Sequence, residues 1–560
     1  MKNQDIMTVN GIPVPLEGES NVLAVIRKAG IQLPTFCYHS ELSIHGACRM
    51  CMFEDEQGRL AAACSAIPEA GMNIRTNTKR LLKYRKTILE LILANHCRDC
   101  TTCLFSTDCK LQDLANRFQI EDVRFPNTNT VRKQDISSLC ITKDQSKCIL
   151  CGDCVRVCNE VQNVGAIDFA GRGSKMTVST AFNIPLGESD CVGCGQCSAA
   201  CPTGALVVRD DRGKLWDAIY NPDVIVTAQI APAVRVAIGK AFGLGKSESA
   251  MGQITAALRR IGFDEVHDTA TGADLTVMEE AAEFLARLEK GPHEYPLFTS
   301  CCPAWVQFAE KKYPELMEHV STCKSPMQMF AAVLKDRHGE KPQFHVAVMP
   351  CTAKKFEAAR PEFKADGGAF VDLVITTQEL IHLIKESGIV FAELEPEAVD
   401  SQFGQMTGAG VIFGVTGGVT EAVLRRVSAA KSQNALRSIA LTGVRGMDGV
   451  KEAAIAAEGG ELRIAIVSGL GNVSKLIERI RAGEHFDFVE VMACPGGCVC
   501  GGGQPSAHFD EKKARGEGLY AADRLMSAKS SDENPLVANL YGGLLKDRSH
   551  ELLHVSYGTH

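Results

Sequence analysis

The chain has 560 residues, of which 45% are hydrophobic, 6% aromatic and 23% charged, and its formal net charge is −7. This composition excludes a disordered or collagen-like chain, and the length suggests three to five domains at roughly 150 residues each. The small negative charge gives no electrostatic reason to expect nucleic-acid binding.

Targeting and membrane segments are not expected from the sequence. The first twenty residues include three acidic residues and no apolar core of a secretory signal. The apolar stretch Asp223–Gly239 is interrupted by Gln229, Pro232 and Arg235, and a membrane helix needs about 18 uninterrupted apolar residues. We therefore expect a cytoplasmic protein without a membrane span.

Cysteine is the most informative residue type, because the chain contains 24 of them. In a long chain without a secretory signal, so many cysteines indicate metal binding rather than disulfides. The cysteines form groups, and the groups define the expected domains. These are residues 1–80, 81–138, 139–210 and 211–520, followed by a segment, 521–560, that wraps the domain before it.

The first cysteine group lies in the N-terminal domain. Its members are Cys37, Cys48, Cys51 and Cys64. Their spacing departs from the C-x4-C-x2-C pattern of plant-type ferredoxins. The preceding segment, which includes Thr8–Gly11, Pro15–Gly18 and the helix-like Asn21–Ala29, resembles the start of a β-grasp 2Fe–2S domain. A zinc site is the alternative interpretation.

The second group combines one histidine with three cysteines: His96, Cys100, Cys103 and Cys109. Taken alone, such a set most often holds structural zinc. Because this segment lies between two predicted iron–sulfur domains, we favour a histidine-ligated 4Fe–4S cluster. Cys97 adjoins His96 and could replace it as a ligand.

The third group has the spacing of a bacterial ferredoxin with two clusters. In that pattern the first three cysteines of each run hold one 4Fe–4S cluster, and the fourth crosses to the other cluster. The pattern assigns one cluster to Cys148, Cys151, Cys154 and Cys201. It assigns the other cluster to Cys158, Cys191, Cys194 and Cys197. A pair of zinc ribbons is the less favoured alternative.

Beyond residue 211, β-rich runs alternate with helix-like stretches. The β-rich runs are Val224–Ala228, His345–Met349, Asp372–Thr376, Arg463–Ser468 and Phe488–Met492. Helix-like stretches such as Leu275–Glu289 and Val419–Ala430 lie between them. This alternation predicts an α/β domain with a largely parallel sheet, preceded by small α+β iron–sulfur domains.

Three cysteine motifs follow predicted strands of this α/β domain: Thr299–Trp305, Met349–Glu357 and Glu490–Cys498, the last running on to Pro505. In an open α/β sheet, ligands bind at the carboxyl ends of the strands, so these loops could converge there. Four thiolates from three loops would hold one further cluster.

In this order and spacing, the three motifs resemble the active-site signatures of FeFe-hydrogenases. The order of the N-terminal groups resembles the multi-cluster clostridial type of that family. The resemblance implies a two-lobed α/β catalytic domain with mostly parallel sheets. It also implies an H-cluster, in which a cysteine joins a 4Fe–4S cube to a di-iron centre with CO, cyanide and a bridging azadithiolate.

The same resemblance implies a function. The enzyme would be a ferredoxin hydrogenase that reversibly converts two protons and two electrons to H2. Electrons would pass between ferredoxin and the H-cluster through one 2Fe–2S and three 4Fe–4S accessory clusters. Separate maturation proteins would supply the di-iron centre.

Site residues follow from matching the motifs. The implied cube ligands are Cys302, Cys351, Cys494 and Cys498, the last shared with the di-iron centre. Cys301 would relay protons to the bridgehead amine, and Lys354 would donate a hydrogen bond to a cyanide ligand. Ser325 would lie near the other cyanide. The remaining pocket residues would be Ala231, Pro232, Met349 and Met492.

A proton route is also implied. Glu280, Glu283 and Arg287 lie on one face if Leu275–Glu289 is a helix. The family's route, carried over to this chain, is Arg287, Glu283, Ser321, Glu280 and Cys301. A solvated helix face is the alternative, and Glu279 beside Glu280 leaves the register open.

Several cysteines depart from the family pattern or have no assigned role. Cys323 and Cys500 add thiols near the expected H-cluster, either to tune it or as buried apolar residues. The roles of Cys97 and Cys140 stay open. Other function classes also remain. They are the iron–sulfur subunit of an NADH or formate dehydrogenase and an iron–sulfur assembly factor, both disfavoured by the three C-terminal motifs.

Overall fold

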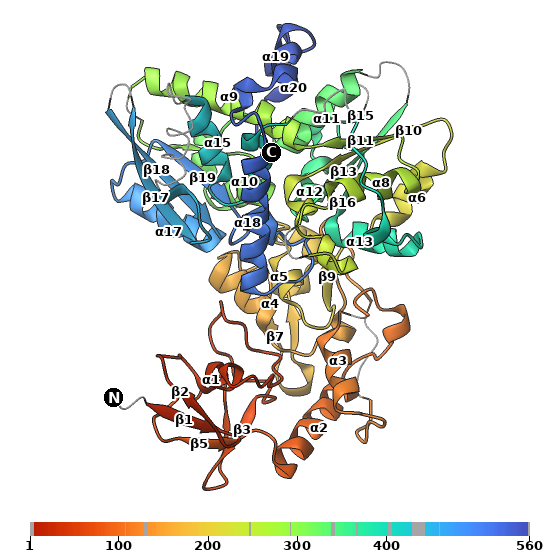
Figure 1. Ribbon diagram of the computed structural model, residues 1–560, viewed down its shortest axis with the longest axis vertical. Coiled ribbons are helices and arrows are strands. Elements are labelled where there is room, and N and C mark those ends of the chain that lie inside the picture. Colours follow the sequence, from red (N-terminus) through yellow and green to blue (C-terminus); the bar gives the residue numbers. More distant parts are fainter. Residues whose placement is uncertain are drawn as a thin grey trace.

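Figure 1 shows the computed structural model, in which the N-terminal sheet lies at one end and the two large sheets lie at the other. The structure describes residues 5–106, 108–127, 133–245, 248–291, 293–337, 342–365, 368–400, 406–427, 443–457 and 460–557. In these ranges, no helix combines the length and the apolar character that crossing a membrane requires.

A five-stranded mixed sheet and one helix form the N-terminal part. In the order β2-β1-β5-β3-β4, the strands are β1 (Ile6–Val9), β2 (Ile12–Pro15), β3 (Met52–Asp55), β4 (Leu60–Ala62) and β5 (Asn73–Arg75). Helix α1 (Val22–Lys28) begins after Asn21, whose side chain accepts a hydrogen bond from the Ala24 amide. Its buried side chains pack with those of the strands, so the helix-like segment predicted here is a helix.

Helix α2 (Lys79–Ala94) leaves this sheet and leads to the next part of the chain. Arg85 of α2 is buried and donates hydrogen bonds to the carbonyls of Met50, Met52 and Thr76. These bonds tie the helix to the sheet. The elements that follow are the 3-10 turn η1 (Cys100–Thr102) and helix α3 (Lys110–Arg117).

Two short helices with the same entry geometry organise residues 139–210. Helix α4 (Asp153–Arg156) follows Gly152 at φ 78°, and α5 (Gln196–Ala200) follows Gly195 at φ 72°. This left-handed conformation favours glycine. A π-helical turn, η3 (Val157–Val161), continues α4. The antiparallel strand pairs are β6 (Ile141–Lys143) with β9 (Leu206–Val208), and β7 (Asp168–Ala170) with β8 (Thr177–Ser179).

The first large sheet is parallel throughout, in the order β11-β10-β13-β16. Its strands are β10 (Ile225–Ile230), β11 (Glu265–Asp268), β13 (Gln343–Met349) and β16 (Leu373–Thr376). Three of these strands lie within two residues of the predicted β-rich runs. The helices that share its core are α6 (Arg212–Ile219), α8 (Met251–Ile261), α11 (Pro326–Arg337) and α13 (Thr377–Glu386).

The second large sheet has the order β12-β19-β18-β17 and is parallel except for the β17–β18 hairpin. Its strands are β12 (Leu297–Phe298), β17 (Val450–Ala457), β18 (Gly460–Ser468) and β19 (Phe488–Met492). Helices α10 (Pro303–Lys312) and α17 (Leu470–Arg481) cover one face, and α9 (Ala270–Glu289) and α15 (Gly418–Val427) cover the other. Both faces of this sheet are buried. The residues of β18 from Ile464 to Val467 are therefore all apolar, although they point alternately to the two faces.

Both predicted helices of this region are present with shifted ends. Helix α9 starts at Ala270, five residues before the predicted start at Leu275. Helix α15 covers the predicted stretch up to Val427, and residues 428–430 lie outside the described part of the chain.

The C-terminal segment packs back onto α9. Its elements are α18 (Phe509–Leu525), η14 (Ser531–Glu533), α19 (Pro535–Gly542) and α20 (Ser549–Leu553). The short helix α14 (Gly408–Ile412) comes earlier in the chain. Asp274 of α9 is buried and accepts hydrogen bonds from Thr407, Ser531 and Asn534 at 2.5, 2.8 and 2.9 Å. Burial raises the pKa of Asp274 to about 6, although these hydrogen bonds lower it.

Residues 139–210 dock directly against the loops that follow the large sheets. The Thr352 hydroxyl donates to the Gly193 carbonyl at 2.6 Å, and the Gln196 side chain donates to the Cys500 carbonyl at 3.1 Å. The backbone of Gly195 lies so close to Thr352 that a Cβ there would be 2.4 Å from its hydroxyl. The interface therefore requires glycine at this position.

Replacing Gly195 with alanine should loosen this interface. The added Cβ would meet the Thr352 hydroxyl and the Gly502 backbone, and overpacking of this kind destabilises by about 1–3 kcal/mol. We expect Gly195→Ala to lower the midpoint of thermal unfolding measured by calorimetry. Gly243→Ala is the matched control, because Gly243 has φ 77° and open space around it. Equal losses in the two variants would contradict the expectation.

Candidate functional site

The four cysteines of the first group converge beside the N-terminal sheet. The Cys48 amide donates to the Cys37 sulfur at 3.3 Å, and the Phe36 amide donates to the Cys48 sulfur at 3.4 Å. A hydrogen bond from Cys37 lowers the pKa of Cys48 to about 5, and one from Cys64 lowers the pKa of Cys51 to about 7. The structure thus brings all four predicted 2Fe–2S ligands together.

His96 presents a free ring nitrogen in the second group. Its Nδ1 accepts a backbone hydrogen bond at 3.1 Å, whereas Nε2 is buried without a hydrogen-bond partner among the described residues. Cys103 is close enough to Cys100 and Cys109 to raise the pKa of both by electrostatic repulsion. A buried imidazole nitrogen without a partner fits a metal ligand. Cys97 is also within range of Cys100, so it remains a competing donor.

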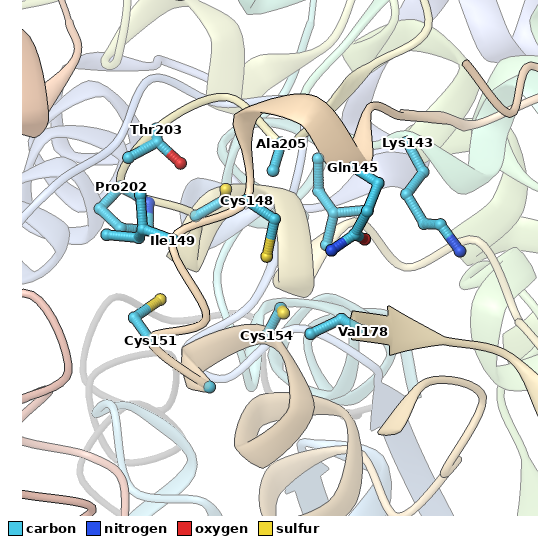
Figure 2. Close-up of a pocket in the computed structure, with 13 residues that line it drawn as sticks. Lys143, Gln145, Cys148, Ile149, Cys151, Cys154, Val178, Pro202, Thr203 and Ala205 are labelled. Atoms are coloured by element: carbon cyan, nitrogen blue, oxygen red, sulfur yellow. The ribbon is translucent and has the colours of Figure 1, made fainter. Parts of the chain in front are cut away.

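Cysteines from both runs of the third group line one pocket. Figure 2 shows the sulfurs of Cys148, Cys151 and Cys154 pointing toward the same space. Cys201, from the second run, lines this pocket too. Burial raises the pKa of Cys148 to about 11. A free thiolate is therefore disfavoured here, and a cationic iron cluster would supply the missing charge.

The other four cysteines of the double run form a separate group. Cys197 lies within electrostatic range of Cys158, Cys191 and Cys194. Within the described ranges, no three His, Cys, Asp or Glu side chains are close enough to hold a single metal ion. The donors instead surround larger spaces, as in Figure 2.

The last three cysteine motifs lie where strands of the two large sheets end. Cys302 follows β12, Cys351 follows β13 and Cys494 follows β19, while Cys498 begins the turn η13 (Cys498–Cys500). Cys494 and Cys498 are both within electrostatic range of Cys302 and Cys351. The Cys302 sulfur also accepts a hydrogen bond from a backbone amide at 3.4 Å. Four thiols from three segments therefore meet at one place.

Lys354 brings a positive charge to these thiols. It is buried, and its ammonium group donates to the Cys301 carbonyl at 3.3 Å and pairs with Glu357 at 2.6 Å. Burial alone would lower the pKa of Lys354, but Glu357, Cys351 and Cys301 raise it overall. The lysine is therefore charged and can donate a hydrogen bond to an anionic ligand.

The predicted pocket also includes a buried, unpaired hydroxyl and a glycine that adjoins Cys498. Ser325 is fully buried, and its hydroxyl has no hydrogen-bond partner in the described part of the chain. Gly497 has φ 90°, and a Cβ there would lie 2.5 Å from the Thr416 amide nitrogen. The other predicted pocket residues are buried at strand ends or beside Cys301: Ala231, Pro232, Met349 and Met492. These features fit a bulky polar cofactor.

One link of the predicted proton route is a direct hydrogen bond. The Ser321 hydroxyl donates to Glu283 at 2.6 Å. Glu280 is fully buried, and neither of its carboxylate oxygens has a hydrogen-bond partner among the described residues, although the Ser300 amide and the Ser321 hydroxyl are close enough to lower its pKa. Burial raises the pKa of Glu280 well above its usual range, and nearby carboxylates add to the effect. Cys301 lies within electrostatic range of Glu280. The raised pKa favours the protonated form of Glu280.

Arg287 lies less directly on the route. Its guanidinium donates to the Tyr295 carbonyl at 2.8 Å and contacts His319 Nδ1 at 3.2 Å. It is within electrostatic range of Glu283, but no ion pair joins these two side chains, both of which the structure describes.

Sequence reasoning missed the polar residues at the outer end of the route. The Thr322 amide donates to Glu283 at 3.1 Å, and His554 lies 2.8 Å from the Thr322 hydroxyl. No local motif marks this pair, because 232 positions separate the two residues.

The cysteines without an assigned role are all partly or fully buried. Cys323 directs its sulfur toward Glu283 at 3.8 Å, so this thiol lies beside the proton route. Burial raises the pKa of Cys500 to about 11. Cys140 packs against Gly193, within electrostatic range of Cys191 and Cys351. Cys323, Cys500 and Cys140 are therefore not assigned to any of the five predicted ligand groups.

Family models match the whole series of domains. The model described as "Iron only hydrogenase large subunit, C-terminal domain" matches residues 224–502, and "Iron hydrogenase small subunit" matches residues 509–560. Three iron–sulfur models precede them. They are a 2Fe–2S cluster binding domain at 6–79, the NADH-ubiquinone oxidoreductase-G iron–sulfur binding region at 85–124 and a 4Fe–4S dicluster domain at 147–205.

Similar proteins extend over the same length. The NADP-reducing hydrogenase subunit HndD of Solidesulfovibrio fructosivorans is 42% identical, covering 98% of both chains. Iron hydrogenase 1 of Clostridium pasteurianum is 36% identical, covering 98% of this chain and 99% of the relative. A solved structure, a variant of the [FeFe]-hydrogenase HydA1 from Chlamydomonas reinhardtii, is 39% identical and covers 62% of this chain and 98% of that one, with a TM-score of 0.53. Together with the site geometry, these similarities show that the chain belongs to the iron-only, or FeFe, hydrogenase family of iron–sulfur oxidoreductases.

Proposed function

We propose that this protein catalyses the reversible reaction 2 H⁺ + 2 e⁻ ⇌ H2 at an H-cluster. The observation that carries the proposal is the convergence of four thiols from three chain segments beside a buried lysine. Cys302, Cys351, Cys494 and Cys498 would hold the cube, with Cys498 shared with the di-iron centre. When bound, this cofactor, with its CO, cyanide and azadithiolate ligands, supplies the redox chemistry.

The residues around the thiols hold the cofactor and exclude water. Lys354 would donate a hydrogen bond to one cyanide ligand, since its ammonium group already lies beside the Cys301 carbonyl. Ser325 would donate to the other, because its buried hydroxyl has no partner among the described side chains. The four apolar residues that complete the pocket are Ala231, Pro232, Met349 and Met492.

Protons would pass between the cofactor site and the surface through Cys301, Glu280, Ser321 and Glu283, with Arg287 near Glu283 at the outer end of the route. The hydrogen bond from Ser321 to Glu283 and the raised pKa of Glu280 support this order. A neutral Glu280 can give up a proton to Cys301 and regain one through Ser321.

Electrons would enter the pocket from the side opposite the proton route. Cys194 of the double run lies within electrostatic range of both Cys351 and Cys494. The hydrogen bond from Thr352 to Gly193 holds these two parts of the chain together. This contact supports a path through one 2Fe–2S and three 4Fe–4S clusters, with the Cys194 cluster last before the H-cluster.

The domains proposed from the sequence are residues 1–80, 81–138, 139–210, 211–520 and 521–560. The sheet and α1 support a β-grasp fold for the first. Helix α18 (Phe509–Leu525) runs unbroken through residue 520, so we place the last boundary before Phe509. The two large sheets support a two-lobed catalytic domain.

The external electron partner is proposed to be ferredoxin, and separate maturation proteins are proposed to insert the di-iron centre. Exposed Lys79, Lys83 and Lys86 lie on one face of α2, near the first cysteine group, and would attract an acidic carrier. A second candidate is transfer to a pyridine nucleotide through partner subunits, because the relative HndD is named as a subunit of an NADP-reducing hydrogenase.

Infrared spectroscopy tests the proposed function. The matured protein should show CO and cyanide stretches and evolve H2 from a chemical reductant. Cys301→Ala should keep those bands but lose at least about 10²-fold in rate, because proton delivery is removed. Cys323→Ala is the control, since it removes a buried thiol beside the same glutamates. Matured protein without the bands would contradict the proposal, and an undiminished rate in Cys301→Ala would contradict the relay.

Substitution of His96 should remove one cluster. We expect His96→Ala to lose one 4Fe–4S signal in electron paramagnetic resonance and about four iron atoms per chain. Cys97→Ser should retain both, since the free Nε2 of His96 makes the histidine the favoured ligand. The reverse result would assign the ligand to Cys97.

Charge reversal on α2 should weaken ferredoxin binding. Lys83→Glu should raise the KM for ferredoxin by about threefold to tenfold at low salt and less at high salt. The rate with a small viologen dye should not change, because the dye needs no docking surface. Lys475→Glu, on an exposed face of α17 (Leu470–Arg481), is the control. A ferredoxin KM that stays constant in Lys83→Glu would exclude this face.

A further inference from the structure

The C-terminal segment places a histidine at the outer end of the proton route. His554 follows α20 (Ser549–Leu553), and its imidazole lies 2.8 Å from the Thr322 hydroxyl through Nδ1. Through Nε2 the same ring lies 2.9 Å from Glu279. The imidazole is therefore held by a hydrogen bond at each nitrogen.

Backbone contacts fix this position. The Lys324 amide donates to the Leu553 carbonyl at 2.8 Å, and the Val555 amide donates to the Thr322 carbonyl at 2.7 Å. Cys323 and His554 form an isolated antiparallel bridge between these contacts. The segment that carries His554 is thus clamped against the loop that carries Ser321 and Thr322.

Thr322 connects this histidine to the route. Its hydroxyl lies 3.4 Å from Glu283, and the other oxygen of Glu283 accepts the Ser321 hydroxyl at 2.6 Å. The contacts therefore connect His554, Thr322, Glu283 and Ser321 in this order. Thr322 is exposed, and the His554 side chain is 11% exposed, so solvent protons can reach this end.

The groups that face His554 come from four places. Glu279 and Glu283 belong to α9, Tyr541 to α19, and His550 and Glu551 to α20, while Cys323 and Lys324 belong to the loop after Ser321. Two carboxylates thus lie near the ring. The stacked His550 ring and the Lys324 ammonium add positive charge when protonated, which opposes the effect of the carboxylates. The Lys324 ammonium donates to the backbone of α20.

We propose that His554 is the proton-transfer residue that links solvent to Glu283 through Thr322. This inference deepens the proposed function and rests on it. During H2 formation, protonated His554 gives its Nδ1 proton to the Thr322 oxygen while the Thr322 hydroxyl gives its own proton to the Glu283 carboxylate. Neutral His554 then takes a proton from solvent, and H2 oxidation runs the same steps in reverse.

The chemistry of the side chains favours His554 over Arg287 at this point. A guanidinium holds its proton at every physiological pH, so Arg287 can orient Glu283 but cannot release a proton to it. An imidazole gains and loses a proton between about pH 5 and 8. His554 also lies one hydroxyl away from Glu283, whereas Arg287 donates to the Tyr295 carbonyl.

Isosteric variants of the matured holoenzyme test the proposal. Thr322→Val removes the hydroxyl, and Thr322→Ser keeps it. His554→Gln keeps a hydrogen-bonding side chain that cannot titrate. We expect Thr322→Val and His554→Gln to slow H2 evolution by about tenfold and to change its pH profile and solvent isotope effect. Thr322→Ser should keep most of the rate, as should His485→Gln, a surface control paired with Asp487.

Two further measurements separate proton transfer from damage to the site. The CO and cyanide bands and the iron content should be the same in all variants.

The outcomes distinguish the role of His554 from the proposed function. An unchanged rate and pH profile in Thr322→Val and His554→Gln would overturn this inference alone. Loss of rate in Thr322→Ser equal to that in Thr322→Val would also overturn it. Wild-type protein without CO and cyanide bands would instead overturn the proposed function.

Discussion

The burial of cysteine sulfur without a compensating charge is the constraint on which this structure depends. Burial raises the pKa of Cys351 to about 12 and that of Cys148 to about 11, so neither thiol ionises readily by itself. Iron supplies the positive charge that stabilises the thiolates. Cluster binding and folding of these loops are therefore coupled. Without the clusters, the fold holds these cysteines in buried places where a thiolate is less stable than in water.

In the proposed function, electrons and protons reach the four central thiols from different sides. The double cysteine run docks through Gly193 and Thr352, whereas the proton groups lie on α9 and on the loop before α11. Figure 1 shows the iron–sulfur part at one end and α9, α19 and α20 at the other. In the proposed function, α20 and His554 therefore act on the proton route at a distance from the iron–sulfur part.

The secondary structure of the large domain was readable from the sequence, because buried parallel strands are short apolar runs between helices. Strand β19 has the predicted bounds, and β13, β16 and β10 differ from theirs by two residues or fewer. Helix α9 was predicted five residues too short, since its first turn is small and polar and gains its stability from Asp274 contacts with distant residues. Such contacts have no local sequence signal.

The sequence by itself determined the donors: cysteine spacing follows from the geometry of iron–sulfur clusters, so each predicted ligand group could be read from a short segment. Only the tertiary structure decided how these groups are joined. The approach of Gly195 to Thr352 and the contact of His554 with Thr322 both link positions far apart in the chain. Spacing along the chain encodes what one loop can bind, whereas neighbours brought together by folding decide where electrons and protons can move.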